Sequence, residues 1–172
     1  MKITLTIFFL IIAVIFQLAL REVGFYVSLA NVSLAYLCVH LLIVKTEEVL
    51  WLALGVGIIL DWFSGLPDGV MVISLPAGIK AAQYVGEMYF SERFHVYILP
   101  VHVLTATIVT MITALLVLGV MALIGWVQAP DWQYYFTWLL PITIGLNLLS
   151  LIPAYGLQAI ELFIQKRYIP KT

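Results

Sequence analysis

Runs of apolar residues, separated by short polar or turn-forming segments, account for almost the whole chain. A helix that crosses a membrane needs roughly 20 mostly apolar residues. Six runs approach or exceed that length, at residues 3–20, 27–44, 49–63, 70–88, 96–124 and 136–163. The pattern predicts an all-α polytopic membrane bundle of about six transmembrane helices, forming one domain over residues 1–172. Five crossings are the alternative, if the third and fourth runs form a re-entrant pair.

The boundaries of these runs carry further signals. Lys2 precedes the first run as in a signal peptide, but the length of the run and the lack of a small-residue cleavage site favour a retained helix. The hexapeptide SGLPDG, residues 64–69, predicts a turn after the third run. Pro141 and Pro153 predict kinks within the last run, because proline removes a helical hydrogen bond.

The composition agrees with a membrane protein and excludes several other classes. Of the 172 residues, 64% are hydrophobic and 10% are charged, whereas average soluble domains have about 25% charged residues. A net charge of -1 offers no basic surface for nucleic acid. Cys38 is the one cysteine, and His40, His95 and His102 lack metal-ligand spacing, so no disulfide or metal site is expected. The chain has no motif for nucleophilic catalysis and no phosphate-binding loop, so we expect neither an enzyme nor a cofactor.

Six crossings distribute the basic residues unequally between the two sides of the membrane. One side carries Lys2, Lys45, Arg93, Lys166, Arg167 and Lys171. The other side carries Arg21 alone, and Lys80 falls within the fourth run. Basic residues concentrate in cytoplasmic segments, so this asymmetry predicts a multi-pass membrane protein with both termini in the cytoplasm. Four tryptophans then fall at the outer interface, where this residue is enriched. They are Trp62, Trp126, Trp132 and Trp138.

The end of the third run places a carboxylate among small residues. Gly57, Asp61, Ser64 and Gly65 occur at positions i, i+4, i+7 and i+8, which share one face of a helix. Glycine on that face allows another backbone to approach closely, as at contacts between membrane helices. We therefore expect helix packing or partner binding here, with Asp61 bonded to a neighbour or to backbone N–H groups of the turn. An Asp that simply caps or ends a helix is the other interpretation.

The fourth run carries a polar stripe at helical spacing. Lys80 lies near its middle, and Gln83, Tyr84 and Glu87 follow at i+3, i+4 and i+7. Charged groups at membrane depth are costly and need partners. Lys80 either snorkels toward the cytoplasm or pairs within the bundle, or the stripe lines a ligand pocket or a partner-helix interface. The candidate partners of Lys80 are Glu87, Asp61 and Asn147.

A glycine and aspartate pattern lies within residues 31–81. An apolar helix that opens with a polar residue is followed by a charged turn and by a second helix ending in a G-x-x-x-D-x-x-x-G-x-x-x-G-like pattern. Gly57, Asp61, Gly65 and Gly69 occupy its four positions, and Pro67 matches a proline frequent in the turn. This segment resembles the MreD family of bacterial rod-shape proteins, and the length and hydropathy of the chain also fit that family.

The resemblance implies a non-catalytic scaffold of the cell-wall elongation complex in the bacterial inner membrane. Such a scaffold associates with the single-span protein MreC, and through it with MreB filaments and peptidoglycan synthases. Members of the family also resemble the six-helix substrate-binding subunits of energy-coupling-factor vitamin transporters. A subunit of that kind is the alternative function, and it would use Lys80, Gln83 and Tyr84 as a polar pocket lining.

The predicted orientation can be tested with a fusion of alkaline phosphatase, which is active only outside the cytoplasm, to the C-terminus. We expect an inactive fusion, because the basic residues beside both termini favour the cytoplasmic side. An active C-terminal fusion would contradict the orientation.

Overall fold

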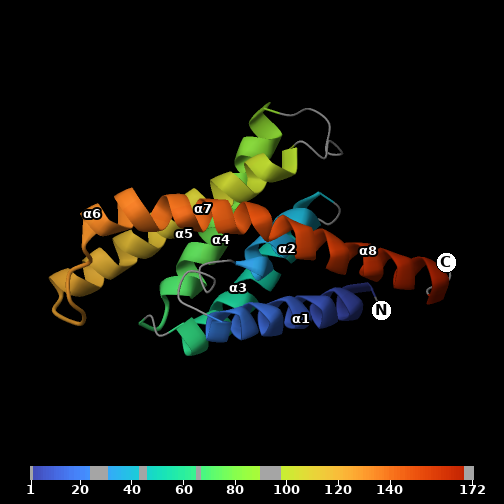
Figure 1. The fold of residues 1–172 in the computed structure, drawn as a ribbon, viewed down its shortest axis with the longest axis horizontal. Coiled ribbons are helices and arrows are strands. Elements are labelled where there is room, and N and C mark those ends of the chain that lie inside the picture. The colour runs from blue at the N-terminus through green and yellow to red at the C-terminus, as the bar shows by residue number, and fades with distance from the viewer. Residues whose placement is uncertain (1, 24–30, 43–45, 65–66, 90–97, 169–172) are drawn as a thin grey trace.

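A computed structural model describes residues 2–23, 31–42, 46–64, 67–89 and 98–168 of the chain. Its elements are α1 (Lys2–Val23), α2 (Val32–Leu41), α3 (Thr46–Ser64), α4 (Val70–Tyr89), α5 (Ile98–Leu123), α6 (Trp132–Tyr134), the π-helical turn η2 (Tyr135–Leu139), α7 (Leu140–Leu149) and α8 (Leu151–Tyr168). Every element in these ranges is helical, which confirms the predicted all-α class. The start of α1 and the end of α8 lie at the same end of the molecule, whereas α6 lies at the opposite end (Figure 1).

Helix lengths give only partial support for membrane crossings. In the described part of the chain, two segments are long and apolar enough to cross a membrane, Ile98–Leu123 and Trp132–Arg167. The apolar helices Thr4–Leu20 and Val32–Leu41 are shorter. The second predicted run is described only over residues 31–42, and residues 27–30 and 43–44 of that run lie outside the described residues. Helix length therefore does not establish six crossings.

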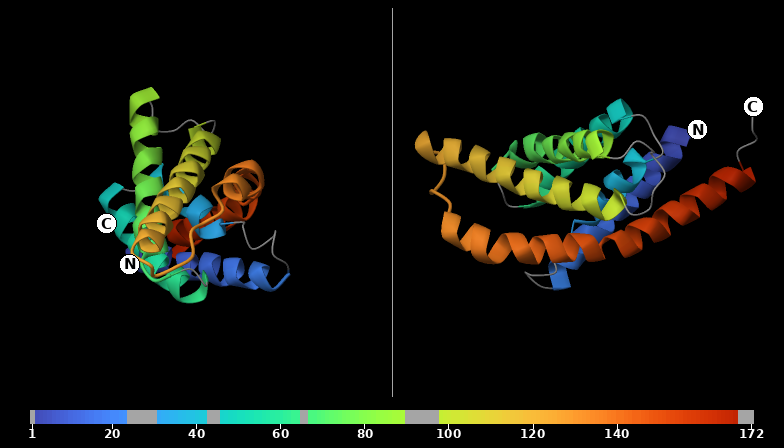
Figure 2. Two further views of the ribbon diagram at one scale, coloured as in Figure 1. Left: turned by 90° about the vertical axis from the view of Figure 1, so that its left-hand side faces the viewer. Right: turned by 90° about the horizontal axis from the view of Figure 1, so that it is seen from above.

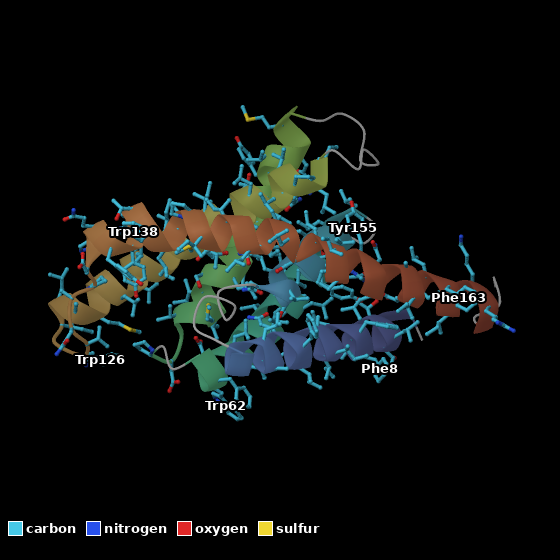
Figure 3. All side chains as sticks on the ribbon, viewed as in Figure 1. Phe8, Trp62, Trp126, Trp138, Tyr155 and Phe163 are labelled. Atoms are coloured by element: carbon cyan, nitrogen blue, oxygen red, sulfur yellow. The ribbon has the colours of Figure 1, made fainter. Side chains whose placement is uncertain are left out.

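Many large apolar side chains are exposed on the described helices, and several polar side chains are buried within the apolar core. Leu123 and Trp62 are 88% and 79% exposed, whereas Asn147 and Glu161 are both 2% exposed. Six of the large apolar and aromatic side chains on the periphery are labelled in Figure 3: Phe8, Trp62, Trp126, Trp138, Tyr155 and Phe163. Soluble monomers rarely expose contiguous apolar surface on this scale. The described helices thus form a bundle with an apolar exterior and polar groups inside.

The short helix α2 lies at the centre of the bundle. All of its residues from Val32 to His40 are buried, and it contacts α1, α3, α4, α5, α7 and α8. A helix that is apolar on every side suits such a position, because it has no face for solvent. The side chain of Asn31 caps the first turn by accepting a 2.8 Å hydrogen bond from the Leu34 N–H. The buried core of the molecule is therefore organised around α2.

The last run forms one long curved path from α6 to α8 (Figure 2). Its helical geometry changes before Pro141, whereas α-helical hydrogen bonds from the Ser150 N–H to Leu146 and from the Ala154 N–H to Ser150 continue the path near Pro153. The Leu140 N–H donates to the carbonyl of Tyr135, which makes the π-helical turn directly before Pro141. Ser150 separates α7 from α8 shortly before Pro153, and its hydroxyl donates a 2.9 Å bond to the Leu146 carbonyl.

Candidate functional site

Asp61 binds the beginning of the next helix. From the last turn of α3, its carboxylate accepts hydrogen bonds from the N–H groups of Gly69 (2.8 Å), Met71 (2.7 Å) and Val72 (3.2 Å). The first N–H groups of an α-helix lack partners within the helix, and the helix dipole favours a negative charge beside them. Asp61 therefore caps α4, and it makes the bonds to backbone N–H groups of the turn that were one of the two partners expected from the sequence.

Gly57 permits the close approach of α3 to α4 that this cap requires. A Cβ atom at Gly57 would lie 2.8 Å from both the Met71 carbonyl oxygen and the Val72 Cα. These neighbours are backbone atoms, so no rotation of a side chain could relieve the contact. Gly57 and Asp61 thus act on one intramolecular contact, and this face of α3 packs against α4.

The turn between α3 and α4 is described from Pro67 onward. The Val70 N–H donates a 3.3 Å bond to the Pro67 carbonyl, and Gly69 has a φ of 95°. Positive φ at this position favours glycine, which has no Cβ. Gly65 and the side chain of Ser64 lie outside the described residues, so the proposed face is seen only in part.

The Lys80 stripe does not line the interior of the bundle, contrary to the pocket interpretation. Lys80 is exposed, Gln83 is partly exposed and Tyr84 is 64% exposed. The Lys80 Nζ donates a 2.8 Å bond to Gln83 Oε1, and the Gln83 amide donates in turn to Glu87. The remaining faces of α4 are used for packing on α3 and α5, and this leaves the polar stripe directed outward.

A second close contact, which was not predicted from the sequence, joins α4 to α5. A Cβ atom at Gly78 would lie 2.6 Å from the Ala106 carbonyl oxygen, and one at Gly86 would lie 2.2 Å from His102 Nε2. Ala82 is fully buried between the two glycines. The small-xxx-small spacing of Gly78, Ala82 and Gly86 was a readable signal for this contact.

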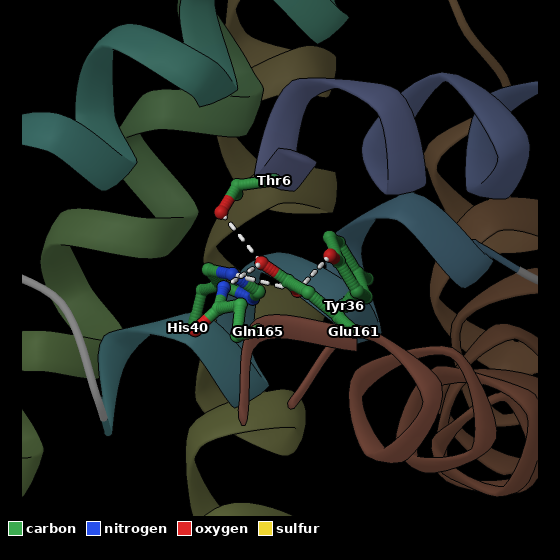
Figure 4. A network of polar contacts seen from close by, with 5 residues as sticks. All are labelled: Thr6, Tyr36, His40, Glu161 and Gln165. Carbon is green, nitrogen blue, oxygen red and sulfur yellow. Dashed lines mark hydrogen bonds and ion pairs between the residues drawn. The ribbon is translucent and has the colours of Figure 1, made fainter. Parts of the chain in front are cut away.

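The most connected polar group in the described structure is Glu161 of α8 (Figure 4). Its Oε1 accepts hydrogen bonds from the Thr6 hydroxyl (2.7 Å) and the Gln165 amide (2.9 Å). Its Oε2 accepts a 2.6 Å bond from the Tyr36 hydroxyl and lies 3.4 Å from His40 Nε2. The cluster of these five residues joins α1, α2 and α8. We call it the Glu161 cluster.

The Glu161 cluster holds three helices together through hydrogen bonds to one carboxylate, and we call this role a helix clamp. A buried carboxylate is tolerated only when donors surround it, and Glu161 obtains them from three helices. This cluster was not predicted from the sequence. An acidic residue inside an apolar run, with Gln165 one turn later, was the available signal.

A second polar connection ties the start of α2 to other helices. The Asn31 N–H donates a 2.6 Å bond to Asn147 Oδ1, and the Asn147 amide donates a 2.9 Å bond to Thr107 Oγ1. Ser33 donates to the Gln17 side chain from both its N–H and its hydroxyl. These bonds and the Glu161 cluster fix both ends of α2.

In the described ranges, no three His, Cys, Asp or Glu side chains lie close enough together to bind a metal ion. His95 lies outside these ranges. Comparison with family models, curated proteins and solved structures finds no match to this chain.

The close contact at Gly57 can be tested against a second glycine of the same helix. We expect Gly57→Leu to lower the free energy of unfolding in detergent by at least about 2 kcal/mol, because its side chain would meet the backbone of α4. Gly55→Leu is the control, because a Cβ at Gly55 meets nothing within 4 Å. Equal stability of the two variants would contradict the contact.

The Glu161 cluster predicts a large cost for removing its acceptor. Glu161→Leu should lower the free energy of unfolding by about 3–5 kcal/mol, because Tyr36 and His40 lose the carboxylate in a buried site. Glu161→Gln keeps one acceptor oxygen and should cost less. Glu87→Leu, at an exposed position, should change stability by less than about 0.5 kcal/mol in the same assay. A Glu161→Leu protein as stable as Glu87→Leu would refute the clamp.

Proposed function

We propose that this chain is a multi-pass, non-catalytic membrane scaffold with both termini in the cytoplasm. The apolar exterior and the buried polar clusters support a bundle embedded in lipid, where polar groups must find partners inside the protein. The arrangement of the helix ends supports the same topology. The start of α1, the end of α2 and the end of α8 lie toward one end of the bundle, and the start of α4 and the end of α5 lie toward the other (Figures 1 and 2).

The tryptophans support the assignment of the outer side. Trp62, Trp126 and Trp138 lie toward the end of the molecule opposite Phe163, which is near the C-terminus (Figure 3). Trp62 and Trp126 are 79% and 75% exposed. Exposed tryptophans toward one end of a bundle suit the boundary between lipid and water.

We propose further that the scaffold serves the bacterial rod-shape complex and binds an MreC-like single-span partner. The α3–α4 hairpin carries this proposal, since Gly57, Asp61 and Gly69 of the MreD-like pattern each have a defined part in building it. The hairpin presents the exposed side chains of Trp62 and Phe63 beside its capped turn. A rigid tip with exposed aromatics is suited to holding a partner at the outer side.

The transporter-subunit alternative receives less support. It needs an inward-facing polar pocket, and the stripe assigned to that role, Lys80, Gln83 and Tyr84, faces outward. A helix clamp such as the Glu161 cluster suits a fixed scaffold better than a bundle that opens around a ligand. The scaffold therefore remains the proposal.

Co-purification after crosslinking in mild detergent tests this function directly. We expect the tagged chain to recover a single-span protein with a periplasmic coiled coil, together with peptidoglycan synthases. The same recovery should fall when Asp61→Ala removes the cap of α4, because the outer turn loses the carboxylate that orders it. Recovery of paired ATPases with a membrane coupling protein would instead establish the transporter subunit.

A further inference from the structure

Two faces of α4 are already occupied by neighbouring helices. Near its start, Met71 and Val72 lie against Gly57 of α3. Farther along, Gly78 and Gly86 lie against α5. Such close contacts leave no room for another helix on either side.

The third face of α4 carries the polar stripe, which is largely exposed among the described residues. Lys80 and Glu87 are exposed, Gln83 is partly exposed, and Tyr84 is 64% exposed. The end of α4 and the start of α5 project beyond the other helices, so this part of the bundle is accessible from outside (Figures 1 and 2). A polar stripe therefore interrupts an exterior that is otherwise rich in large apolar side chains.

Lys80 is the unusual member of this stripe. It lies nine residues before Tyr89, the last residue of α4, which corresponds to about 13 Å along a helix. A four-carbon side chain cannot cover that distance to reach the helix end. The polar partner of its Nζ in the described structure is the neutral Gln83 oxygen, at 2.8 Å. Among the described residues, the Lys80 ammonium thus makes no direct ion pair, and the Glu87 carboxylate is linked to it only through the Gln83 amide.

We propose that the face of α4 formed by Lys80, Gln83, Tyr84 and Glu87 is the docking surface for a partner's transmembrane helix that carries one carboxylate in its middle third. Charge complementarity selects this occupant, because an ammonium at mid-membrane gains most from an opposite charge at the same depth. The i, i+3/i+4, i+7 spacing of the stripe matches one seam of a helix pair. The inference rests on the proposed scaffold function and names the kind of helix that the scaffold holds.

A synthetic helix provides the test even while the natural partner is unidentified. The purified full-length chain, labelled at its terminus, is reconstituted in phosphatidylcholine vesicles with acceptor-labelled Leu/Ala helices of about 20 residues carrying a central Glu, Gln or Leu. Energy transfer reports association. We expect the central-Glu helix to bind about tenfold more tightly than the central-Leu helix. Lys80→Leu should abolish this preference, and Lys166→Leu, which removes an exposed lysine from α8, should preserve it.

Charge reversal keeps the test independent of any effect on folding. Lys80→Glu should transfer the preference to a helix with a central Lys, which a merely damaged protein would not do. Equal binding of the Glu and Leu helices by the unaltered protein would overturn the proposal. A Glu preference that persists in Lys80→Leu, or that disappears when phosphatidylglycerol is added, would also overturn it, the latter by assigning the face to lipid headgroups.

The outcomes for this face and for the scaffold can be separated. If Lys80→Leu still recovers the single-span partner as well as the unaltered chain does, this docking surface is refuted and the scaffold stands. If the unaltered chain recovers no single-span protein, the scaffold is refuted, and the vesicle experiment still decides whether the face binds an acidic helix.

Discussion

A carboxylate enclosed by apolar helices must be surrounded by donors, and this constraint on Glu161 determines how three helices meet. Thr6, Tyr36 and Gln165 donate to it, and His40 lies beside it, so α1, α2 and α8 are held in one register. A shift of any of these helices along its axis would remove hydrogen bonds from the buried Glu161 carboxylate. That loss costs far more free energy than a change in apolar contacts. The packing of the central helix α2 follows from this attachment and from the bonds at its other end.

The remaining helices are joined by close packing of the backbone. Gly57 brings α3 against α4, and Gly78 and Gly86 bring α4 against α5. In lipid, apolar side chains gain little by leaving the solvent, so small residues and buried hydrogen bonds supply the specificity of helix contacts. Buried hydrogen bonds therefore hold the helices around α2, and close backbone contacts at glycines hold the helices around α4. The helix with these close contacts, α4, also carries the exposed polar stripe that includes Lys80.

This division suits a scaffold. The clamp gives the bundle a fixed shape, and the capped α3–α4 turn holds Trp62 and Phe63 in exposed positions beside it. The outward stripe of α4 gives the same structure an exposed charged position between two packed faces. In the proposed scaffold, a partner would meet apolar side chains at the tip and charge along α4.

The sequence by itself determined the helical class and the approximate position of each helix, because helix-length apolar runs leave few other structures possible. It also indicated the roles of Gly57 and Asp61, since both act on a helix that follows directly in the chain. Only the tertiary structure decided the partners of Glu161, whose donors lie up to 155 residues away. It also decided the outward direction of Lys80, because spacing along one helix gives the angle between side chains, whereas the packing of neighbouring helices decides which face remains uncovered.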